Sequence, residues 1–135
     1  MLPGPSLLIL LIEDEPYFRE VIADSLEVSG ARFRFEIASN FDDGIVLLNA
    51  SSPSLLIANV LLLGSGDGLR LAEAAHRLGV PTLLISGHPE VIAKHEEQRL
   101  PFLAKPFRLS ELQRAIRTLI DGEPASADQA KLNLP

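Results

Sequence analysis

The sequence predicts an α/β fold in which a doubly wound parallel sheet carries helices on both faces. Five apolar runs alternate with five segments of helical pattern, and this is the arrangement of parallel strands joined by helical crossovers. The first run, Leu7 to Ile12, is apolar at every position, as expected for a central strand that is covered on both faces.

The first half of the chain contains two strand–helix units and a third strand. Pro16 fits the first turn of a helix that runs to about Val28, because a helix does not need the missing proline N–H there. The second strand, Phe33 to Ala38, is polar at alternate positions, which places it nearer an edge. Ser39 or Asn40 caps the next helix, and the third strand follows from Leu55 to Asn59.

The second half repeats the alternation. A glycine-rich loop, Gly64 to Gly68, leads into a helix that ends near Leu78. The remaining elements are a strand (Val80 to Ser86), a short polar helix (Pro89 to about Glu97), a strand (Phe102 to Ala104) and an amphipathic helix (Ser110 to Leu119).

One domain is expected over residues 7–122. Residues 1–6 form an N-terminal extension. Residues 123–135 are rich in Ala, Ser and Pro and have little periodicity, which indicates a flexible tail rather than a second domain.

Composition excludes several classes of function. With 12 basic and 18 acidic residues the formal net charge is −6, so the chain is not expected to bind nucleic acid or anionic membranes. It has no cysteine, which rules out disulfides and thiolate chemistry. The apolar run at residues 7–12 is too short to span a membrane and lacks the flanks of a signal peptide. These features predict a cytoplasmic protein.

Four signals follow the predicted strands at their carboxyl ends, where ligands of such folds bind. They are Glu13-Asp14-Glu15, Asn59, Ser86-Gly87 and Lys105-Pro106-Phe107. Over residues 7–122 this pattern resembles a response-regulator receiver domain. The resemblance implies a flavodoxin-like, three-layer fold with five parallel strands in the order 2-1-3-4-5 and five helices.

The resemblance also implies a Mg²⁺ site. Its ligands would be Glu13, Asp14, Asn59 and the backbone carbonyl of Leu61, with Glu15 pointing away from the site. An alternative without a metal is that the acids charge the first turn of the following helix, where the helix dipole favours anions. Asn59 removes one negative charge relative to a carboxylate, so Mg²⁺ binding is expected to be weakened.

In receivers the residue at position 59 is the phosphate-accepting Asp. A carboxylate is a competent nucleophile for forming an acyl phosphate, whereas the amide of Asn59 carries no charge and is not. Receivers usually have Pro four residues later, and here that residue is Leu63. This departure favours a natural, degenerate receiver over an engineered Asp-to-Asn change in a receiver that is otherwise phosphorylated normally.

The other signals match the switch residues of receivers. Ser86 and Gly87 would contact the phosphoryl group, and Lys105 would pair with the acceptor and the phosphate. Beside an amide, Lys105 is expected to keep at most a hydrogen bond. The peptide between Lys105 and Pro106 is expected to be cis. Phe102 stands where receivers carry a switching aromatic, but core packing explains it better because it lacks the hydroxyl of tyrosine.

The sequence therefore predicts a stand-alone, receiver-like module of two-component phosphorelay signalling that acts through protein contacts and is not an enzyme. Its partners would be a sensor histidine kinase or a downstream target, and a homodimer would form through the last two helices and the fifth strand. An alternative from another class is a haloacid-dehalogenase-like phosphatase. The segment Asp14-Glu15-Pro16-Tyr17-Phe18 lacks the second Asp and the Thr or Val of that family's motif.

Overall fold

A five-stranded parallel sheet forms the centre of the molecule. The computed structural model of the chain describes residues 7–28, 33–88 and 101–121. The strands lie in the order β2-β1-β3-β4-β5, and every neighbouring pair is parallel. Their bounds are β1 Leu7–Ile12, β2 Phe33–Ala38, β3 Leu55–Asn59, β4 Thr82–Ser86 and β5 Phe102–Ala104. The predicted strand order is confirmed.

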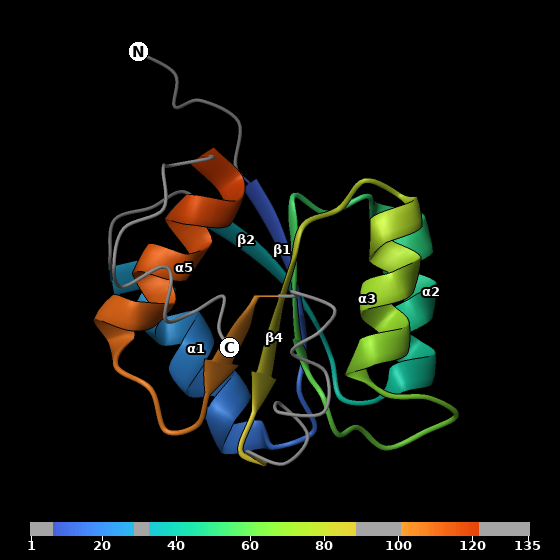
Figure 1. The fold of residues 1–135 in the computed structure, drawn as a ribbon, viewed down its shortest axis with the longest axis horizontal. Coiled ribbons are helices and arrows are strands. Elements are labelled where there is room, and N and C mark those ends of the chain that lie inside the picture. The colour runs from blue at the N-terminus through green and yellow to red at the C-terminus, as the bar shows by residue number, and fades with distance from the viewer. Residues whose placement is uncertain (1–6, 29–32, 89–100, 122–135) are drawn as a thin grey trace.

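Helices cover both faces of this sheet. Helices α1 (Pro16–Val28) and α5 (Leu109–Asp121) lie on one face. Helices α2 (Phe41–Ser51) and α3 (Gly68–Arg77) lie on the other (Figure 1). The expected helix from Pro89 to about Glu97, the extension 1–6 and the tail 123–135 lie outside the described residues. Within the described ranges, no helix is long and apolar enough to cross a membrane.

The central strand β1 divides its side chains between two apolar layers. Leu10 and Ile12 pack towards α2 and α3, whereas Ile9 and Leu11 pack towards α1 and α5. All four are fully buried. This burial explains why β1 is apolar at every position, because a strand covered on both faces has no solvent side.

Strand β2 is at an edge of the sheet, as its alternating polarity predicted. The expected start of β4 at Val80 is wrong by two residues, because the strand begins at Thr82. The N–H of Val80 donates to the carbonyl oxygen of Ala75 at 2.9 Å, which closes the preceding helix. Pro81 has no N–H to give to a ladder, so regular pairing starts at the next residue.

Side-chain caps fix the starts of two helices, α2 and α3. The Asn40 side chain accepts from the N–H of Asp43 at 2.8 Å at the start of α2. Asp67 accepts from the N–H of Arg70 at 3.0 Å at the start of α3. A Cβ atom added to Gly68 would collide with the backbone carbonyl of Asn59. Glycine at this position therefore lets α3 begin directly against the end of β3.

Candidate functional site

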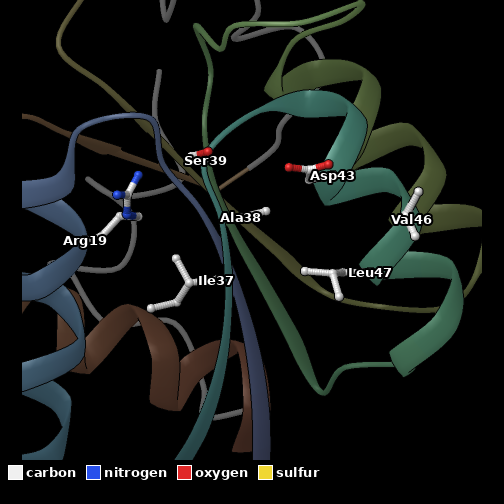
Figure 2. Close-up of a pocket in the computed structure, with 7 residues that line it drawn as sticks. All are labelled: Arg19, Ile37, Ala38, Ser39, Asp43, Val46 and Leu47. Carbon is white, nitrogen blue, oxygen red and sulfur yellow. The ribbon is translucent and has the colours of Figure 1, made fainter.

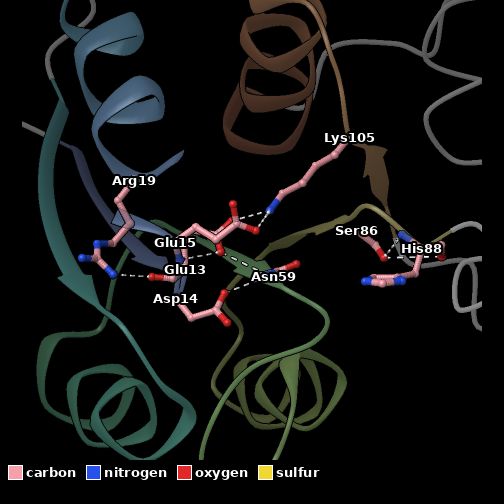
Figure 3. Close-up of polar contacts among 8 residues, drawn as sticks. All are labelled: Glu13, Asp14, Glu15, Arg19, Asn59, Ser86, His88 and Lys105. Atoms are coloured by element: carbon pink, nitrogen blue, oxygen red, sulfur yellow. Dashed lines mark hydrogen bonds and ion pairs between the residues drawn. The ribbon is translucent and has the colours of Figure 1, made fainter. Parts of the chain in front are cut away.

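The carboxyl ends of four neighbouring strands bring the predicted site residues to one edge of the sheet. Glu13 and Asp14 follow β1, Asn59 ends β3, Ser86 ends β4 and Lys105 follows β5. Since β1, β3, β4 and β5 are adjacent and parallel, these residues share one end of the sheet. Figure 3 shows Glu13, Asp14, Asn59 and Lys105 pointing toward one another.

Glu13 is the centre of this cluster. It is only 1% exposed, and its two carboxylate oxygens have different partners. Oε1 accepts from Nζ of Lys105 at 2.7 Å, and Oε2 accepts from Nδ2 of Asn59 at 3.1 Å. Burial raises the pKa of the Glu13 carboxyl, Asp14 adds to the rise, and Lys105 opposes it. The backbone N–H of Glu15 also donates to Oε2, at 3.3 Å, so three N–H donors hold this carboxylate in a buried place.

Asn59 bridges the two acids that follow β1. Its Nδ2 donates to Oε2 of Glu13 at 3.1 Å and to Oδ1 of Asp14 at 3.2 Å. A carboxylate at this position has no hydrogen to donate and would repel both neighbours. The amide therefore makes an attractive contact in a place where an aspartate would add a third negative charge.

Lys105 makes an ion pair that the sequence analysis did not anticipate. Its ammonium lies 2.7 Å from Glu13 and 3.7 Å from Oε1 of Glu15. The expectation that Lys105 keeps at most a hydrogen bond is wrong, because Glu13 provides the opposite charge. The expectation that Glu15 points away is also wrong, because its carboxylate lies near Lys105 and near the other two acids. The peptide bond between Lys105 and Pro106 is cis.

Two residues of α1 contact Lys105 and Glu13, and the sequence did not identify them as site residues. The Lys105 ammonium lies 4.1 Å from the centre of the Phe18 ring, which is a cation–π contact. Phe18 in turn meets Phe107 edge to face, with ring centres 5.4 Å apart. Arg19 donates to the backbone carbonyl of Glu13 at 2.8 Å. Phe18 and Arg19 lie in the first turn of the helix that follows the acidic run, and this position could have identified both as site residues.

Ser86 is buried but turned away from Asn59 (Figure 3). Its Oγ accepts from the backbone N–H of His88 at 3.0 Å, and its carbonyl accepts from the N–H of Lys105 at 2.9 Å. Gly87 beside it is exposed. Phe102 is 4% exposed and packs in the apolar layer under α2 and α3, as the core-packing interpretation expects.

The acids have the chemistry of a metal site, but Asn59 does not complete it as placed. One carboxylate oxygen from each of Glu13, Asp14 and Glu15 lies within 4.8 Å of the others, and oxygen ligands of this kind suit Mg²⁺. Asn59, however, presents its N–H groups to two of these acids. For Asn59 to ligate a cation bound by these acids, its amide would have to turn so that the carbonyl oxygen faces the cation. The role of the Leu61 carbonyl stays a prediction.

Comparison with known proteins decides the family. The sequence matches the response regulator receiver domain over residues 9–117. The chain belongs to the response regulator receiver domain family. This receiver is 29% identical over 127 residues to the response regulator Rre1 of Synechocystis, which covers 89% of this chain and 54% of that protein.

A second relative is the C4-dicarboxylate transport transcriptional regulatory protein DctD of Pseudomonas aeruginosa. It is 26% identical over 121 residues, which are 84% of this chain and 25% of DctD. The receiver thus spans about half, or less, of the length of these two relatives. A putative response regulator structure from Chloroflexus aurantiacus shares the fold, with a TM-score of 0.76 and 22% identity over 87% of this chain and 99% of that one.

Membership in this family gives the broad function. Receiver domains are signalling modules of two-component systems, and they interact with histidine kinases and downstream effectors. They typically bind Mg²⁺ at an acidic cluster, and Glu13, Asp14 and Glu15 form such a cluster here. The comparisons give no support to the phosphatase alternative.

Proposed function

We propose that this receiver domain takes part in two-component signalling without forming the usual aspartyl phosphate, and that it acts through contacts with other proteins rather than as an enzyme. The observation that carries the proposal is the position and bonding of Asn59. It ends β3, next to the acids that follow β1, and donates to both Glu13 and Asp14. An amide in this place cannot attack a phosphoryl group as a carboxylate does.

The second part of the proposal is that Mg²⁺ binding is weakened. Three carboxylates that crowd one edge repel one another unless positive charge or N–H donors compensate. Lys105 supplies a full charge to Glu13, and Asn59 supplies two N–H bonds. A Mg²⁺ ion would have to displace these donors before Glu13 and Asp14 could ligate it, so its affinity falls.

The remaining switch residues are then remnants of a phosphate site. Ser86 and Lys105 keep the residue types that would bind a phosphoryl group. Gly87 lies beside the Lys105 side chain, which a Cβ atom added to Gly87 would meet at 3.7 Å. In the proposed state Phe102 stays packed in the core. Contact with a histidine kinase or target would use the side formed by β5 and α5.

Intact-mass measurement after incubation with acetyl phosphate and Mg²⁺ tests the proposal. The parent chain should gain no phosphoryl group, and Asn59→Asp should gain one. Asn49→Asp is the matched control, because Asn49 is exposed on α2 and the change adds the same charge away from the pocket. Phosphorylation of the parent would contradict the missing-nucleophile proposal. An Asn59→Asp variant that also stays unmodified would contradict the assignment of Ser86 and Lys105 as phosphate-binding residues.

A second measurement separates the metal from the nucleophile. We expect Mg²⁺ to raise the melting temperature of Asn59→Asp more than that of the parent, because a carboxylate adds both a charge and an oxygen ligand. Asn49→Asp should respond like the parent. An equal response of the parent and Asn59→Asp would mean that Asn59 does not weaken the site.

A further inference from the structure

Among the described residues, the outer edge of β2 has no neighbouring strand. Strand β2 pairs with β1 on one side, and within residues 7–28, 33–88 and 101–121 no strand pairs with its other side. The carbonyl of Ala38 accepts from the N–H of Glu13 at 3.1 Å, so it points inward, towards β1. Backbone groups alternate in direction along a strand, and therefore those of Phe33, Phe35 and Ile37 point outward.

This edge is flanked by exposed apolar side chains. Ile37 is 44% exposed and Val46 on α2 is 65% exposed. A shallow depression of about 510 Å³ lies around the carboxyl end of β2. Figure 2 shows Arg19 and Ile37 on its α1 side and Asp43 and Val46 on its α2 side. An unpaired strand beside such side chains is a site for adding another strand.

We propose that β2 pairs antiparallel with β2 of a second copy of this chain, about a two-fold axis at Phe35. In that register the outward backbone groups of Phe35 bond those of the partner's Phe35. Arg34 then faces the partner's Glu36, and Glu36 faces the partner's Arg34. Opposite charges at directly facing positions stabilise antiparallel pairs, and two-fold symmetry gives this pair twice.

The charge pattern selects this register over its neighbours. A two-fold pairing must keep residues with outward backbone groups opposite one another. The next possible registers therefore move the partner strand by two residues. One step in one direction places Arg34 opposite the partner's Arg34. One step in the other direction places Glu36 opposite the partner's Glu36. Facing like charges destabilise a pair, so only the register centred on Phe35 is complementary.

Both faces of the joined sheets are complementary in this register. Arg34 and Glu36 lie on the face of α2, where Ser51 donates to Oε2 of Glu36 at 3.2 Å and holds that side chain beside the edge. On the face of α1, Ile37 would contact the partner's Phe33, which covers an exposed apolar side chain. One strand supplies both halves of the match, and this favours a second copy over an unrelated peptide.

Charge reversal tests the pairing. Analytical ultracentrifugation over a wide concentration range should show a concentration-dependent dimer of the parent chain, weak because the interface is small. Arg34→Glu and Glu36→Arg should each be monomeric, since each places two like-charge pairs across the axis. An equimolar mixture of the two variants should restore the dimer as a heterodimer, because its two facing pairs are again opposite in sign.

Matched variants locate the dimer and control for folding. Arg117→Glu reverses an exposed charge on α5, a helix that packs against β3 and β4, and should leave the dimer intact. Ser51→Ala removes the contact to Glu36 and should leave a dimer. A parent chain that stays monomeric throughout, a dimer lost in Arg117→Glu but kept in Arg34→Glu, or a mixture that fails to associate would each overturn the proposal.

Discussion

At the scale of single residues, the acidic cluster depends on the two hydrogen bonds that Asn59 donates. An aspartate there would lie beside Glu13 and Asp14, and a bound cation or lysine would have to offset the repulsion. The amide instead supplies hydrogen bonds of 3.1 and 3.2 Å to two of these acids. Lys105 is thereby available to Glu13, with which it forms the shortest contact of the cluster, 2.7 Å.

The pKa of Glu13 should depend on these neighbouring charges and hydrogen bonds. Its pKa lies above the ordinary 4.5, mainly because burial disfavours the charge. The folded chain therefore binds this proton more tightly than the unfolded chain. The stability that it contributes is complete below pH 4.5 and is lost as the pH rises through the folded-state pKa. Lys105→Met removes the opposing charge and hydrogen bond, so the pKa should rise further.

The measurement is a side-chain carboxyl NMR titration of Glu13 without divalent cations. Lys105→Arg keeps the positive charge and serves as the control, and its Glu13 midpoint should stay closer to that of the parent than the midpoint of Lys105→Met does. A midpoint that falls in Lys105→Met would contradict the placement of Lys105 as the stabilising partner of the Glu13 carboxylate.

The sequence identified the members of the pocket but not their partners. Residue types at the ends of apolar runs were enough to place Glu13, Asn59, Ser86 and Lys105 at one edge, because parallel strands end together. The Lys105–Glu13 pair joins residues 92 positions apart. Which of three neighbouring acids a lysine reaches depends on side-chain directions that only packing, here against Phe18, determines.

At the scale of elements, the loop between β3 and α3 is fastened to the start of α2. The Asp42 carboxylate accepts from the hydroxyl of Ser65 at 2.7 Å and from its N–H at 3.1 Å. The N–H of Phe41 donates to the carbonyl of Leu63 at 2.9 Å. Gly64 adopts a φ of +110°, which favours glycine. These bonds hold the loop although Leu63 is exposed.

Low pH should weaken the hydrogen bonds between Asp42 and Ser65. Hydrogen bonds from Ser65 hold the pKa of Asp42 below its ordinary 3.8. The stability that these bonds contribute is therefore present above pH 3.8 and is lost as the pH falls through the folded-state pKa. Ser65→Ala should raise the Asp42 pKa toward 3.8, but not fully, because the backbone N–H remains. NMR titration of Asp42 measures this shift, and Ser51→Ala is the control that should leave it unchanged.

The sequence predicted the elements better than their ends. Pro16 and Asn40 set the starts of α1 and α2 where local chemistry predicted them. The start of β4 differed because a hydrogen bond from Val80 back to Ala75 competes with strand pairing. Asp42 gave no signal, since its partner Ser65 lies 23 residues away in a loop without periodicity.

At the scale of the whole molecule, one sheet lies between two apolar layers. Leu10 belongs to the layer under α2 and α3, and its neighbour Leu11 belongs to the layer under α1 and α5. Both are fully buried. Loss of either layer would expose one complete face of the same strand, so neither layer is expected to unfold alone.

We therefore expect Leu10→Ala and Leu11→Ala to have similar effects. Each should lower the free energy of unfolding by about 2–5 kcal/mol, through lost burial and a residual cavity. Urea unfolding followed by circular dichroism should show one transition in both variants, with the slope of the parent. Leu63→Ala, at a side chain that is 68% exposed, is the control and should change stability by less than about 0.5 kcal/mol. The two layers would be separate folding units if only one of the two substitutions lowered the midpoint. A second transition in either variant would lead to the same conclusion.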